Sequence, residues 1–398
     1  MKLVLIADTF PPFRTSGAVQ LRDLSREFVR QGHELTVLLP DPDLADRWSL
    51  EISDGAQVLR LRAPSTKDIG YVHRTIGEWL MPHVMLRNLR KSPMAGQLWE
   101  GVVWYSPSIF HAPLVRALKR QSACRGYLII RDIFPEWAVD LGLLRPGLAY
   151  RFFKRIARQQ YEAADIIGVQ TTGNLGYFST WHQAGRSRVL EVLQNWLDAP
   201  ANDPCPIRLA ETALAERKIF VYAGNMGIAQ SMDILIDLAA RMQSRQDIGF
   251  LFVGRGSDAK RLKAQAGMLG LDNVLFLNEI APDEIPDLYT QCYAGIVALD
   301  PRHKSHNIPG KFLTYMQNSL PVLANVNSGN DLAALVREEN VGEVCETNQL
   351  EELEERCEAL IRKIETDPDL PERCSQLFQR QFSVAQTVRQ IVGALEDI

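Results

Sequence analysis

The sequence of 398 residues lacks long apolar runs, basic runs interleaved with aromatic residues, and zinc-finger or RNP-like patterns. Because no run reaches 18 apolar residues, no membrane-spanning helix is predicted. The segment Met1–Asp8 reaches an acid too early to form the core of a secretory signal peptide, so we expect a cytoplasmic protein. The missing basic and aromatic patterns argue against nucleic acid as a partner.

Cysteine is scarce, and no Cys-x-x-Cys pair or adjacent histidine cluster occurs. Neither a zinc site nor a disulfide framework is therefore indicated. The six cysteines are expected to be reduced and structural: Cys124, Cys205, Cys292, Cys345, Cys357 and Cys374.

Charge is balanced over the whole chain but not along it. The 44 Lys+Arg, 48 Asp+Glu and 46% hydrophobic residues are typical of a globular enzyme of two to three domains. Residues 1–195 carry 25 basic and 18 acidic side chains, whereas residues 196–398 carry 19 and 30. A basic N-terminal half is compatible with docking on an anionic membrane surface.

Short apolar runs bounded by turn residues alternate with segments of helical period. This alternation predicts an α/β protein whose parallel strands are covered on both faces by helices. In the first half the predicted strands are Lys2–Ala7, Glu34–Leu39, Val58–Leu61, Gly101–Tyr105, Gly126–Ile130 and Ile166–Gln170, with a helix at Gly17–Gln31. In the second half they are Lys218–Ala223, Gly249–Gly254, Val274–Leu277, Gly295–Ala298, Pro321–Ala324 and Gly342–Cys345, with helices at Asp233–Ser244, Asp258–Gly267 and Asp283–Gln291. Each half is predicted to be a doubly wound, Rossmann-like domain.

A segment rich in proline, aspartate and asparagine, Asn195–Arg208, separates the two halves. Such a composition interrupts regular structure and is typical of an interdomain linker. We therefore expect an N-terminal domain at 1–195, a linker at 196–217 and a C-terminal domain at 218–372. Residues 373–398 are expected to form a helix that returns to the N-terminal domain.

Loops that follow predicted strands carry the candidate binding residues, because ligands bind at the carboxyl edge of open α/β sheets. The first such loop, Asp8–Gly17, lacks a Gly-x-Gly-x-x-Gly fingerprint, which argues against a dinucleotide. A plain surface connection is the alternative. Two glycine-bearing loops, Ala223–Gln230 and Val253–Ser257, are predicted to let backbone N–H groups approach a nucleotide diphosphate.

The polar segment Ser305–Met316 leads into a predicted helix, whose start is marked by Pro309 and Gly310. Lys311, in the first turn, would place an ammonium beside free backbone N–H donors. A cation there opposes the helix dipole unless an anion is bound, so Lys311 is the best candidate for a phosphate ligand. An exposed lysine at a helix cap is the alternative.

The order of several motifs resembles the GT-B glycosyltransferases of family four. The motifs are Gly32–Val37, Arg131–Glu136, Tyr222–Gly227, Phe252–Gly256, and Pro309–Lys311 followed by Leu320–Ala324. The similarity covers essentially the whole chain and is greatest to a bacterial O-antigen and capsule subgroup typified by L-fucosamine transferases. It implies two Rossmann-like domains that face an interdomain cleft, with a nucleotide-sugar donor on the C-terminal domain and the acceptor on the N-terminal one.

The resemblance implies transfer from a UDP-sugar to a lipid-diphosphate-linked saccharide at the inner-membrane surface, with no required metal or other cofactor. The sugar is expected to be an N-acetylamino deoxyhexose such as N-acetyl-L-fucosamine. The sequence offers no Ser/His/Asp triad or paired catalytic carboxylates. This suits the retaining mechanism of the family, in which the leaving diphosphate takes the acceptor proton and the protein acts by positioning and electrostatics. The alternatives are a UDP-sugar epimerase of the same fold and a non-catalytic nucleotide-sugar-binding subunit.

Matching motif positions imply three groups of site residues. The expected catalytic residues are Arg131, Asp132 and His306. The expected donor-binding residues are Gly224, Asn225, Met226, Gly227, Gln230, Gly254, Arg255, Ile280, Asn307, Ile308, Gly310, Lys311 and Thr314. The expected acceptor-binding residues are Ser16, Gly17, Ser106 and Glu136. For Asp132 and Glu136, N-capping of the following helix is the alternative.

Three features depart from the wider family. Asn225 and Gln230 stand where it usually has Arg and Lys, so the diphosphate clamp is weaker by two formal charges. His306 and Thr314 stand where it has a pair of glutamates, and threonine cannot make the bidentate contact that grips ribose hydroxyls. Arg131 stands where the wider family often has histidine.

Two tracts combine apolar and basic residues in the manner of segments that lie on a membrane surface. They are residues 71–91, which Pro82 is expected to split, and Tyr150–Arg158. Ordinary packing against the sheet is the alternative for both tracts.

Overall fold

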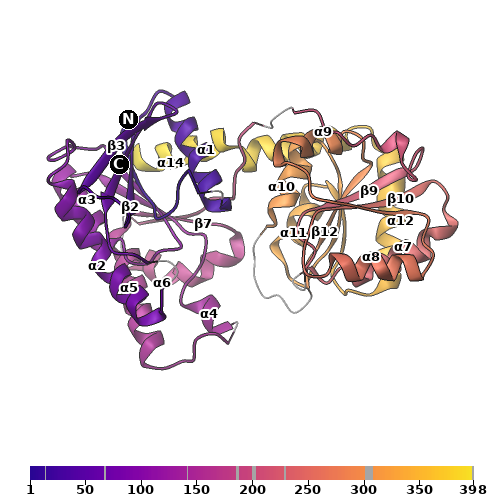
Figure 1. The fold of residues 1–398 in the computed structure, drawn as a ribbon, viewed down its shortest axis with the longest axis horizontal. Coiled ribbons are helices and arrows are strands. Elements are labelled where there is room, and N and C mark those ends of the chain that lie inside the picture. The colour runs from indigo at the N-terminus through magenta and orange to yellow at the C-terminus, as the bar shows by residue number, and fades with distance from the viewer. Residues whose placement is uncertain are drawn as a thin grey trace. The chain divides into compact units, whose positions relative to one another are not determined.

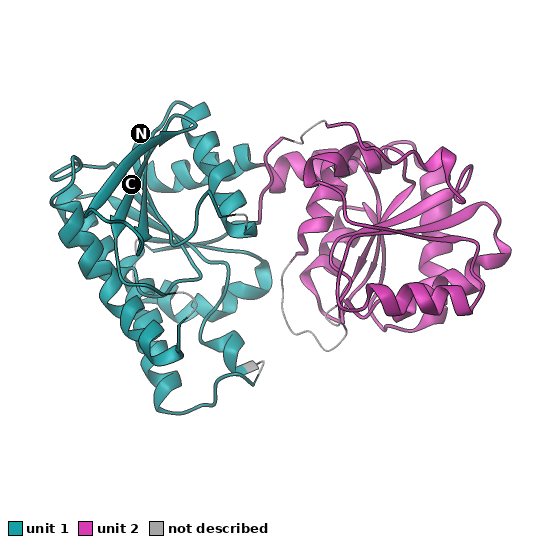
Figure 2. Ribbon diagram, in the orientation of Figure 1, with its two compact units in different colours: residues 1–194, 384–398 teal, residues 195–383 magenta. Residues whose placement is uncertain are grey.

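A computed structural model describes residues 1–398 except 14, 67–68, 141, 185–187, 200–202, 228–229, 301–307 and 397–398. The chain forms two compact units: unit 1 comprises Met1–Gln194 with Val384–Ile398, and unit 2 comprises Asn195–Ser383 (Figure 2). Each unit contains its own sheet with helices on both faces, which confirms the predicted α/β class (Figure 1).

Unit 1 is built on an eight-stranded sheet in the order β3-β4-β2-β1-β5-β6-β7-β8. Its strands are β1 (Lys2–Ile6), β2 (Glu34–Asp41), β3 (Trp48–Ser53), β4 (Ala56–Arg62), β5 (Gly101–Tyr105), β6 (Arg125–Ile129), β7 (Ile166–Val169) and β8 (Val189–Val192). Its helices are α1 (Ser16–Arg30), α2 (Tyr71–Leu89), α3 (Ala112–Ser122), α4 (Glu136–Asp140), α5 (Leu148–Ala163), α6 (Ser179–Gln183) and α14 (Val384–Glu396). Only the β3–β4 pair is antiparallel among these described strands. The strand order reverses at β1, which places the expected ligand site of this sheet at the end of β1.

Unit 2 is built on a six-stranded sheet in the order β11-β10-β9-β12-β13-β14, and each of these described strands pairs in parallel with its neighbours. Its strands are β9 (Lys218–Ala223), β10 (Ile248–Val253), β11 (Val274–Leu277), β12 (Ala294–Ala298), β13 (Val322–Asn325) and β14 (Gly342–Cys345). Its helices are α7 (Asp233–Arg241), α8 (Ala259–Met268), α9 (Ile285–Tyr289), α10 (Gly310–Gln317), α11 (Asp331–Glu338), α12 (Leu350–Thr366) and α13 (Leu370–Leu377). The switch point of this sheet is at the end of β9.

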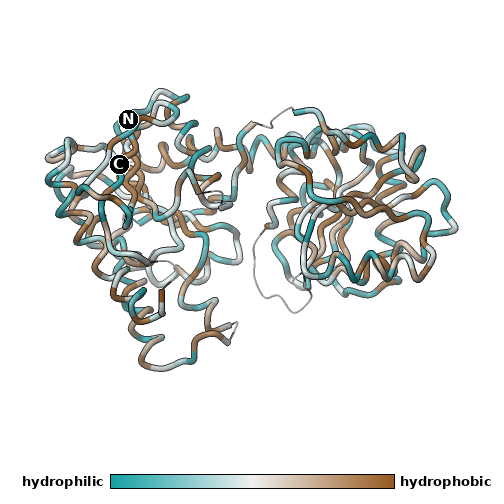
Figure 3. The backbone as a smooth tube through the Cα atoms, in the orientation of Figure 1, coloured by the Kyte–Doolittle hydropathy of each residue, from teal (hydrophilic) through white to brown (hydrophobic). Residues whose placement is uncertain are grey.

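The strands form where the sequence has unbroken apolar runs. Every residue of β5, β10 and β12 is buried, as expected for strands covered on both faces. Apolar strands cross the middle of each unit, and polar residues lie on the outer helices (Figure 3). In α1 one face buries Leu21, Leu24 and Phe28, and the Thr15 hydroxyl caps the helix by accepting from Ala18 N (3.3 Å).

The predicted strands are all present to within two residues, and the structure adds β3 and β8. These two strands form the edges of the unit 1 sheet. No residue of either strand is fully buried. An edge strand packs on one side only, so it lacks the continuous apolar run by which the central strands were predicted.

The unit boundary at Gln194 lies one residue from the expected domain end at 195, and the expected linker at 196–217 is part of unit 2. Cys205, Leu209 and Leu214 are buried in the core of that unit. Proline interrupts regular structure in this segment, but its apolar side chains still pack on the domain that follows.

The C-terminal segment 373–398 does not return to unit 1 as a whole. Residues 373–383 belong to unit 2, and Cys374 and Phe382 lie in its core. The helix α14 alone packs on unit 1, where Arg125 Nη1 donates to the Ala394 carbonyl (2.8 Å).

Pro82 does not split the tract 71–91, since α2 runs through it without a break. A proline removes one backbone hydrogen bond of the helix. Met81, Met85 and Leu89 pack into the core of unit 1 on either side of this position, so tertiary contacts hold the helix together. Among the residues described, no helix has the length and hydropathy needed to cross a membrane.

Candidate active site

Two glycine loops, at the carboxyl ends of β9 and β10, are joined by backbone hydrogen bonds. Gly224 N donates to the Val253 carbonyl (2.8 Å), and Met226 N donates to the Arg255 carbonyl (2.8 Å). Gly254 has φ of +142°, and a Cβ on it would lie 2.0 Å from the Gly224 oxygen. Glycine is therefore required here so that the two loops can touch.

Several backbone N–H groups of these loops, which we expect to approach a diphosphate, have acceptors within the protein. Gly254 N donates to the Leu277 carbonyl (3.2 Å). Gly227 N donates to Gln230 Oε1 (3.0 Å), which also accepts from Asn225 Nδ2 (3.2 Å). A bound diphosphate would have to displace the Gln230 amide to reach the Gly227 N–H.

Lys311 lies in the first turn of α10, and its ammonium reaches the end of β9. Its Nζ donates to Tyr222 Oη (3.2 Å) and lies 4.5 Å from the centroid of that ring. A Cβ on Gly224 would lie 3.4 Å from the same Nζ. Tyr222 Oη in turn donates to the Asn225 carbonyl (2.6 Å). These contacts form a cationic corner at the switch point of unit 2.

Burial lowers the pKa of Lys311 from 10.5 to about 8. Desolvation is the one cause of this shift, so no carboxylate among the described residues offsets the charge. A bound anion would favour the charged amine and raise its pKa again. The corner is therefore prepared for an anion, and Tyr222, which the sequence reasoning missed, is part of it.

Arg255 does not join this corner. Its side chain is 80% exposed, and its Nε pairs with Glu279 Oε2 (2.9 Å). The expected contribution of Arg255 to a diphosphate site therefore has no support in the contacts of the arginine. The neighbouring Ile280 is half-buried against the core of unit 2.

The remaining donor-binding residues lie around the start of α10. Ile308 is buried, and Gly310 begins the helix. The Thr314 hydroxyl donates to the Gly310 carbonyl (3.3 Å) within the same helix. His306 and Asn307 lie outside the described residues.

In unit 1, Arg131 lies two residues after the end of β6 and is 8% exposed. Its Nη1 donates to the Leu193 carbonyl (3.0 Å), and its Nη2 donates to the Gln194 carbonyl (3.3 Å). Burial lowers the pKa of Arg131, and the nearby Tyr105 opposes that change. Arg131 therefore connects the segment after β8 to the end of β6 by hydrogen bonds, and its buried guanidinium places a positive charge at this edge of the sheet.

Asp132 is exposed at the same edge of the sheet. Partial desolvation raises the pKa of its carboxyl, whereas the Arg131 guanidinium opposes the rise. The buried Ser106 donates through Oγ to the Asp132 carbonyl (3.4 Å). Asp132 is thus a solvent-accessible acid next to the buried guanidinium of Arg131.

The predicted acceptor residues divide into two groups. Gly17 lies beside Tyr105 at the end of β5, because a Cβ on Gly17 would lie 3.6 Å from Tyr105 Oη. Ser16 is exposed at the start of α1. Glu136 is engaged by α5 instead, since its carboxylate pairs with Lys154 Nζ (3.4 Å).

Sequence reasoning also missed His111, which ends the loop between β5 and α3. Its side chain is fully buried, its ring nitrogens have no hydrogen-bond partner among the described residues, and burial lowers its pKa. Its one signal in the sequence is its place just before an apolar helical segment, which many structural residues share. Across the described residues, no three His, Cys, Asp or Glu side chains gather in a way that could hold a metal.

Comparison with known proteins shows what this chain is similar to. The family model described as "Glycosyl transferases group 1" matches residues 208–379, most of unit 2. The putative colanic acid biosynthesis glycosyl transferase WcaI of Escherichia coli K12 is 26% identical over 388 residues, covering 87% of this chain and 86% of that protein. The protein is a glycosyltransferase of the GT-B fold.

Solved structures support the fold of this glycosyltransferase. HepE of Anabaena in complex with UDP has a TM-score of 0.66 and 16% identity, with 100% of both chains covered. WaaG, a glycosyltransferase involved in lipopolysaccharide biosynthesis, has a TM-score of 0.62 and 14% identity over the same full coverage. At such low identity these likenesses establish the fold alone.

Proposed function

We propose that this glycosyltransferase moves a sugar from a UDP-sugar to a lipid-diphosphate-linked saccharide in cell-surface polysaccharide biosynthesis. The sugar we propose is an N-acetylamino deoxyhexose such as N-acetyl-L-fucosamine, transferred with retention and without a metal. We also propose that the protein belongs to the subgroup of L-fucosamine transferases. The functions of two similar proteins support the pathway class, since WcaI is named for colanic acid biosynthesis and WaaG for lipopolysaccharide biosynthesis.

The observation that carries the proposal is the Lys311 ammonium beside Gly224 at the switch point of the group 1 domain. A half-buried amine without a carboxylate partner is suited to bind a phosphate through charge-assisted hydrogen bonds. Because Arg255 is engaged with Glu279, Lys311 is the cation that we assign to the diphosphate of UDP. The structure of HepE with UDP supports a uridine nucleotide as the ligand.

Unit 1 supplies the side chains that we assign to the acceptor. Asp132 is the exposed acid at the carboxyl edge, and Arg131 beneath it adds a fixed positive charge. We assign Asp132 to orienting an acceptor hydroxyl, while the leaving diphosphate, held by Lys311, takes the proton. The catalysis we propose therefore rests on positioning and electrostatics rather than on a dedicated nucleophile.

The test is NMR of UDP-N-acetylamino deoxyhexoses with and without a lipid-diphosphate-linked saccharide. Acceptor-dependent release of UDP, with the anomeric configuration of the donor kept in the product, is the expected result. A new isomer of the nucleotide sugar in the absence of acceptor would identify an epimerase instead. Product with the opposite anomeric configuration would overturn the retaining mechanism but not the transfer.

We also propose that unit 1 docks on the anionic inner-membrane surface through the N-terminal half of α2. Apolar side chains on this half are exposed, among them Tyr71 (90%), Val72 (71%) and Trp79 (51%). In the second tract, Tyr150–Arg158, only part of the apolar surface is exposed. Phe153 packs edge-on against Phe134, whereas Phe152 is exposed. Exposed apolar groups beside basic residues suit a bilayer with anionic headgroups.

Flotation with phosphatidylglycerol vesicles tests this docking. Replacing Val72 and Trp79 with serine should reduce the bound fraction, because both side chains are exposed in the folded protein. The control replaces the exposed Met268 and Leu269 of unit 2 with serine, which should leave binding unchanged. If the unmodified protein does not float with vesicles at low salt, the membrane role fails.

A further inference from the structure

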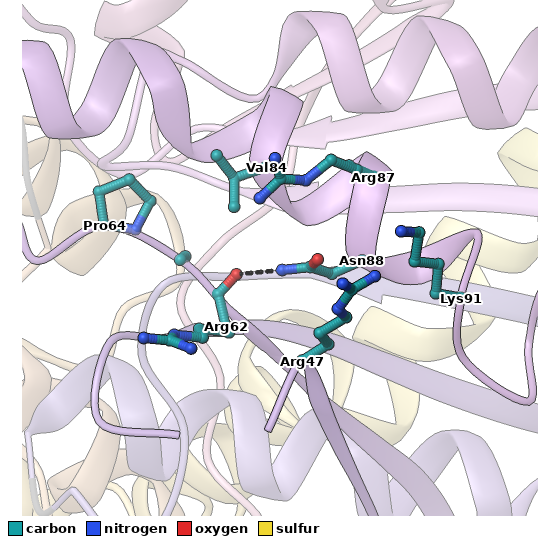
Figure 4. Close-up of a pocket in the computed structure, with 8 residues that line it drawn as sticks. Arg47, Arg62, Pro64, Val84, Arg87, Asn88 and Lys91 are labelled. Carbon is teal, nitrogen blue, oxygen red and sulfur yellow. Dashed lines mark hydrogen bonds between the residues drawn. The ribbon is translucent and has the colours of Figure 1, made fainter. Parts of the chain in front are cut away.

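A cavity of about 430 Å³ opens in unit 1 between the end of β4 and the last turns of α2 (Figure 4). Its volume is within the range of small-molecule sites. One wall carries Arg47 and Arg62, and the other carries Arg87 and Lys91. The remaining lining residues are Ala63, Pro64, Val84 and Asn88.

The backbone brings the two arginines of the first wall together although they are 15 positions apart. Arg62 N donates to the Arg47 carbonyl (3.0 Å), which extends the antiparallel β3–β4 pair by one step. The second wall is joined to the first by Asn88, whose Nδ2 donates to the Arg62 carbonyl (2.7 Å). Asn88 is buried, so this bond fixes the position of α2 against β4.

The charge in this cavity is of one sign. Four lining residues are cations, and no described lining residue is an acid. Asp41, Asp43 and Asp46 are close in sequence to Arg47, but none of them lines the cavity. The salt bridges of the described residues include none made by these four cations, and Arg62 Nη1 donates to a neutral group, the Ala45 carbonyl (3.3 Å).

The end of α2 explains only part of this arrangement. Arg87 and Lys91 lie near the negative end of the helix dipole, which favours cations there. Arg47 and Arg62 come from the sheet and gain nothing from that dipole. All four cations are exposed, so solvent screens their mutual repulsion, but a concentration of one sign of charge at one hollow favours the binding of an anion.

The chemistry of the lining selects the kind of anion. Several guanidinium groups with an ammonium match the oxygens of a multiply charged phosphate better than the single charge of a carboxylate. None of the described lining residues is aromatic, so they offer no surface on which a nucleic-acid base could stack. We propose that this cavity binds a phosphate-bearing anion through Arg47, Arg62, Arg87 and Lys91, at a site separate from the donor corner of unit 2. This site does not depend on the proposed transfer reaction.

Two sources of phosphate fit the same chemistry, a soluble diphosphate and the headgroup of an anionic lipid. The first arm of the test measures pyrophosphate binding by calorimetry on the full chain carrying Lys311→Met. This substitution removes the ammonium from the proposed donor site of unit 2, so that only binding elsewhere is measured. Adding Arg87→Gln and Lys91→Gln should weaken binding by about tenfold or more, because charge-assisted contacts to phosphate are lost. Adding Arg47→Gln and Arg62→Gln should have a similar effect from the opposite wall.

The matched control adds Lys260→Gln and Lys263→Gln, which remove the same charge from exposed positions on α8. The second arm repeats the comparison by flotation with vesicles of phosphatidylcholine, with and without phosphatidylglycerol. Loss in the first arm supports a soluble phosphate, and loss confined to the second arm supports a lipid headgroup. Equal losses in cavity and control variants, or no loss in either arm, would overturn the proposal. Val72→Ser with Trp79→Ser should leave pyrophosphate binding unchanged, which separates this site from the apolar docking surface.

Discussion

Protonation of Lys311 and binding of the donor diphosphate should be linked. Burial lowers the pKa of this amine to about 8, so it is mostly charged at pH 7 and mostly neutral at pH 9. Over that interval the charged fraction falls from about nine tenths to about one tenth, so the affinity for UDP should weaken roughly tenfold. Replacing Lys311 with methionine should weaken UDP binding about ten- to a hundredfold at pH 7, since a charge-assisted phosphate contact is lost.

Isothermal titration calorimetry with UDP at pH 7, 8 and 9 measures both effects. Lys311→Met is the matched control for the pH series, because any titration of UDP itself occurs equally with either protein. The extra pH dependence of the unmodified protein is then assigned to Lys311. The reasoning is refuted if both proteins show the same slope with pH, or if the dissociation constant of the variant at pH 7 is unchanged.

The same lysine should destabilise the protein when no donor is bound. Its pKa is lower in the folded chain than the ordinary value of 10.5, so the folded state disfavours the charged amine. The unfolded chain binds more protons between pH 8 and 10.5, and stability should therefore rise with pH across that window. At pH 7 the penalty is fully present, so Lys311→Met should raise the free energy of unfolding by up to about 3 kcal/mol. Urea unfolding at pH 7 without UDP checks this sign, and a less stable variant would contradict it.

Three further substitutions test the site. Thr314→Ala should weaken UDP binding by less than about tenfold, because this hydroxyl already donates within α10 and is neutral, and 2′-deoxy-UDP should bind only slightly more weakly than UDP. Gly254→Ala should lower the free energy of unfolding by more than about 2 kcal/mol in urea, since its Cβ would lie 2.0 Å from the Gly224 oxygen, whereas Gly267→Ala in α8, with open space around it, should not. Asp132→Asn should reduce acceptor-dependent UDP release yet change stability by less than about 0.5 kcal/mol, because this side chain is exposed; an equal loss of stability and activity would indicate a structural role.

Much of the fold follows from local pattern. The central strands were predicted because continuous apolar runs of four to eight residues can be buried only on both faces of a sheet. The position of Lys311 was predicted in the same way, because Pro309 and Gly310 mark a helix start on any fold. These signals lie within a few residues, so they can be read without knowledge of distant contacts.

The roles of the glycine loops depended on contacts that no local pattern contains. Both loops were predicted at the right places, but Gly254 serves the contact with Gly224, and Gly227 N is occupied by Gln230. Whether an N–H is free depends on which loop lies beside it. The strand order β10-β9-β12 decides that neighbour, and it is set by packing of the whole sheet.

The sequence by itself determined the α/β class, the core strands and the cation at the start of α10, because each is a property of a short segment. Tertiary structure decided which residues share a site. It kept α2 helical through Pro82 by burying Met81 and Met85, and it placed 196–217 in unit 2. It also brought Arg47 to the same cavity as Lys91, although 44 positions separate them. Long-range pairing of strands and helices creates such groups, and the free energy that selects one pairing comes from the burial of the whole core.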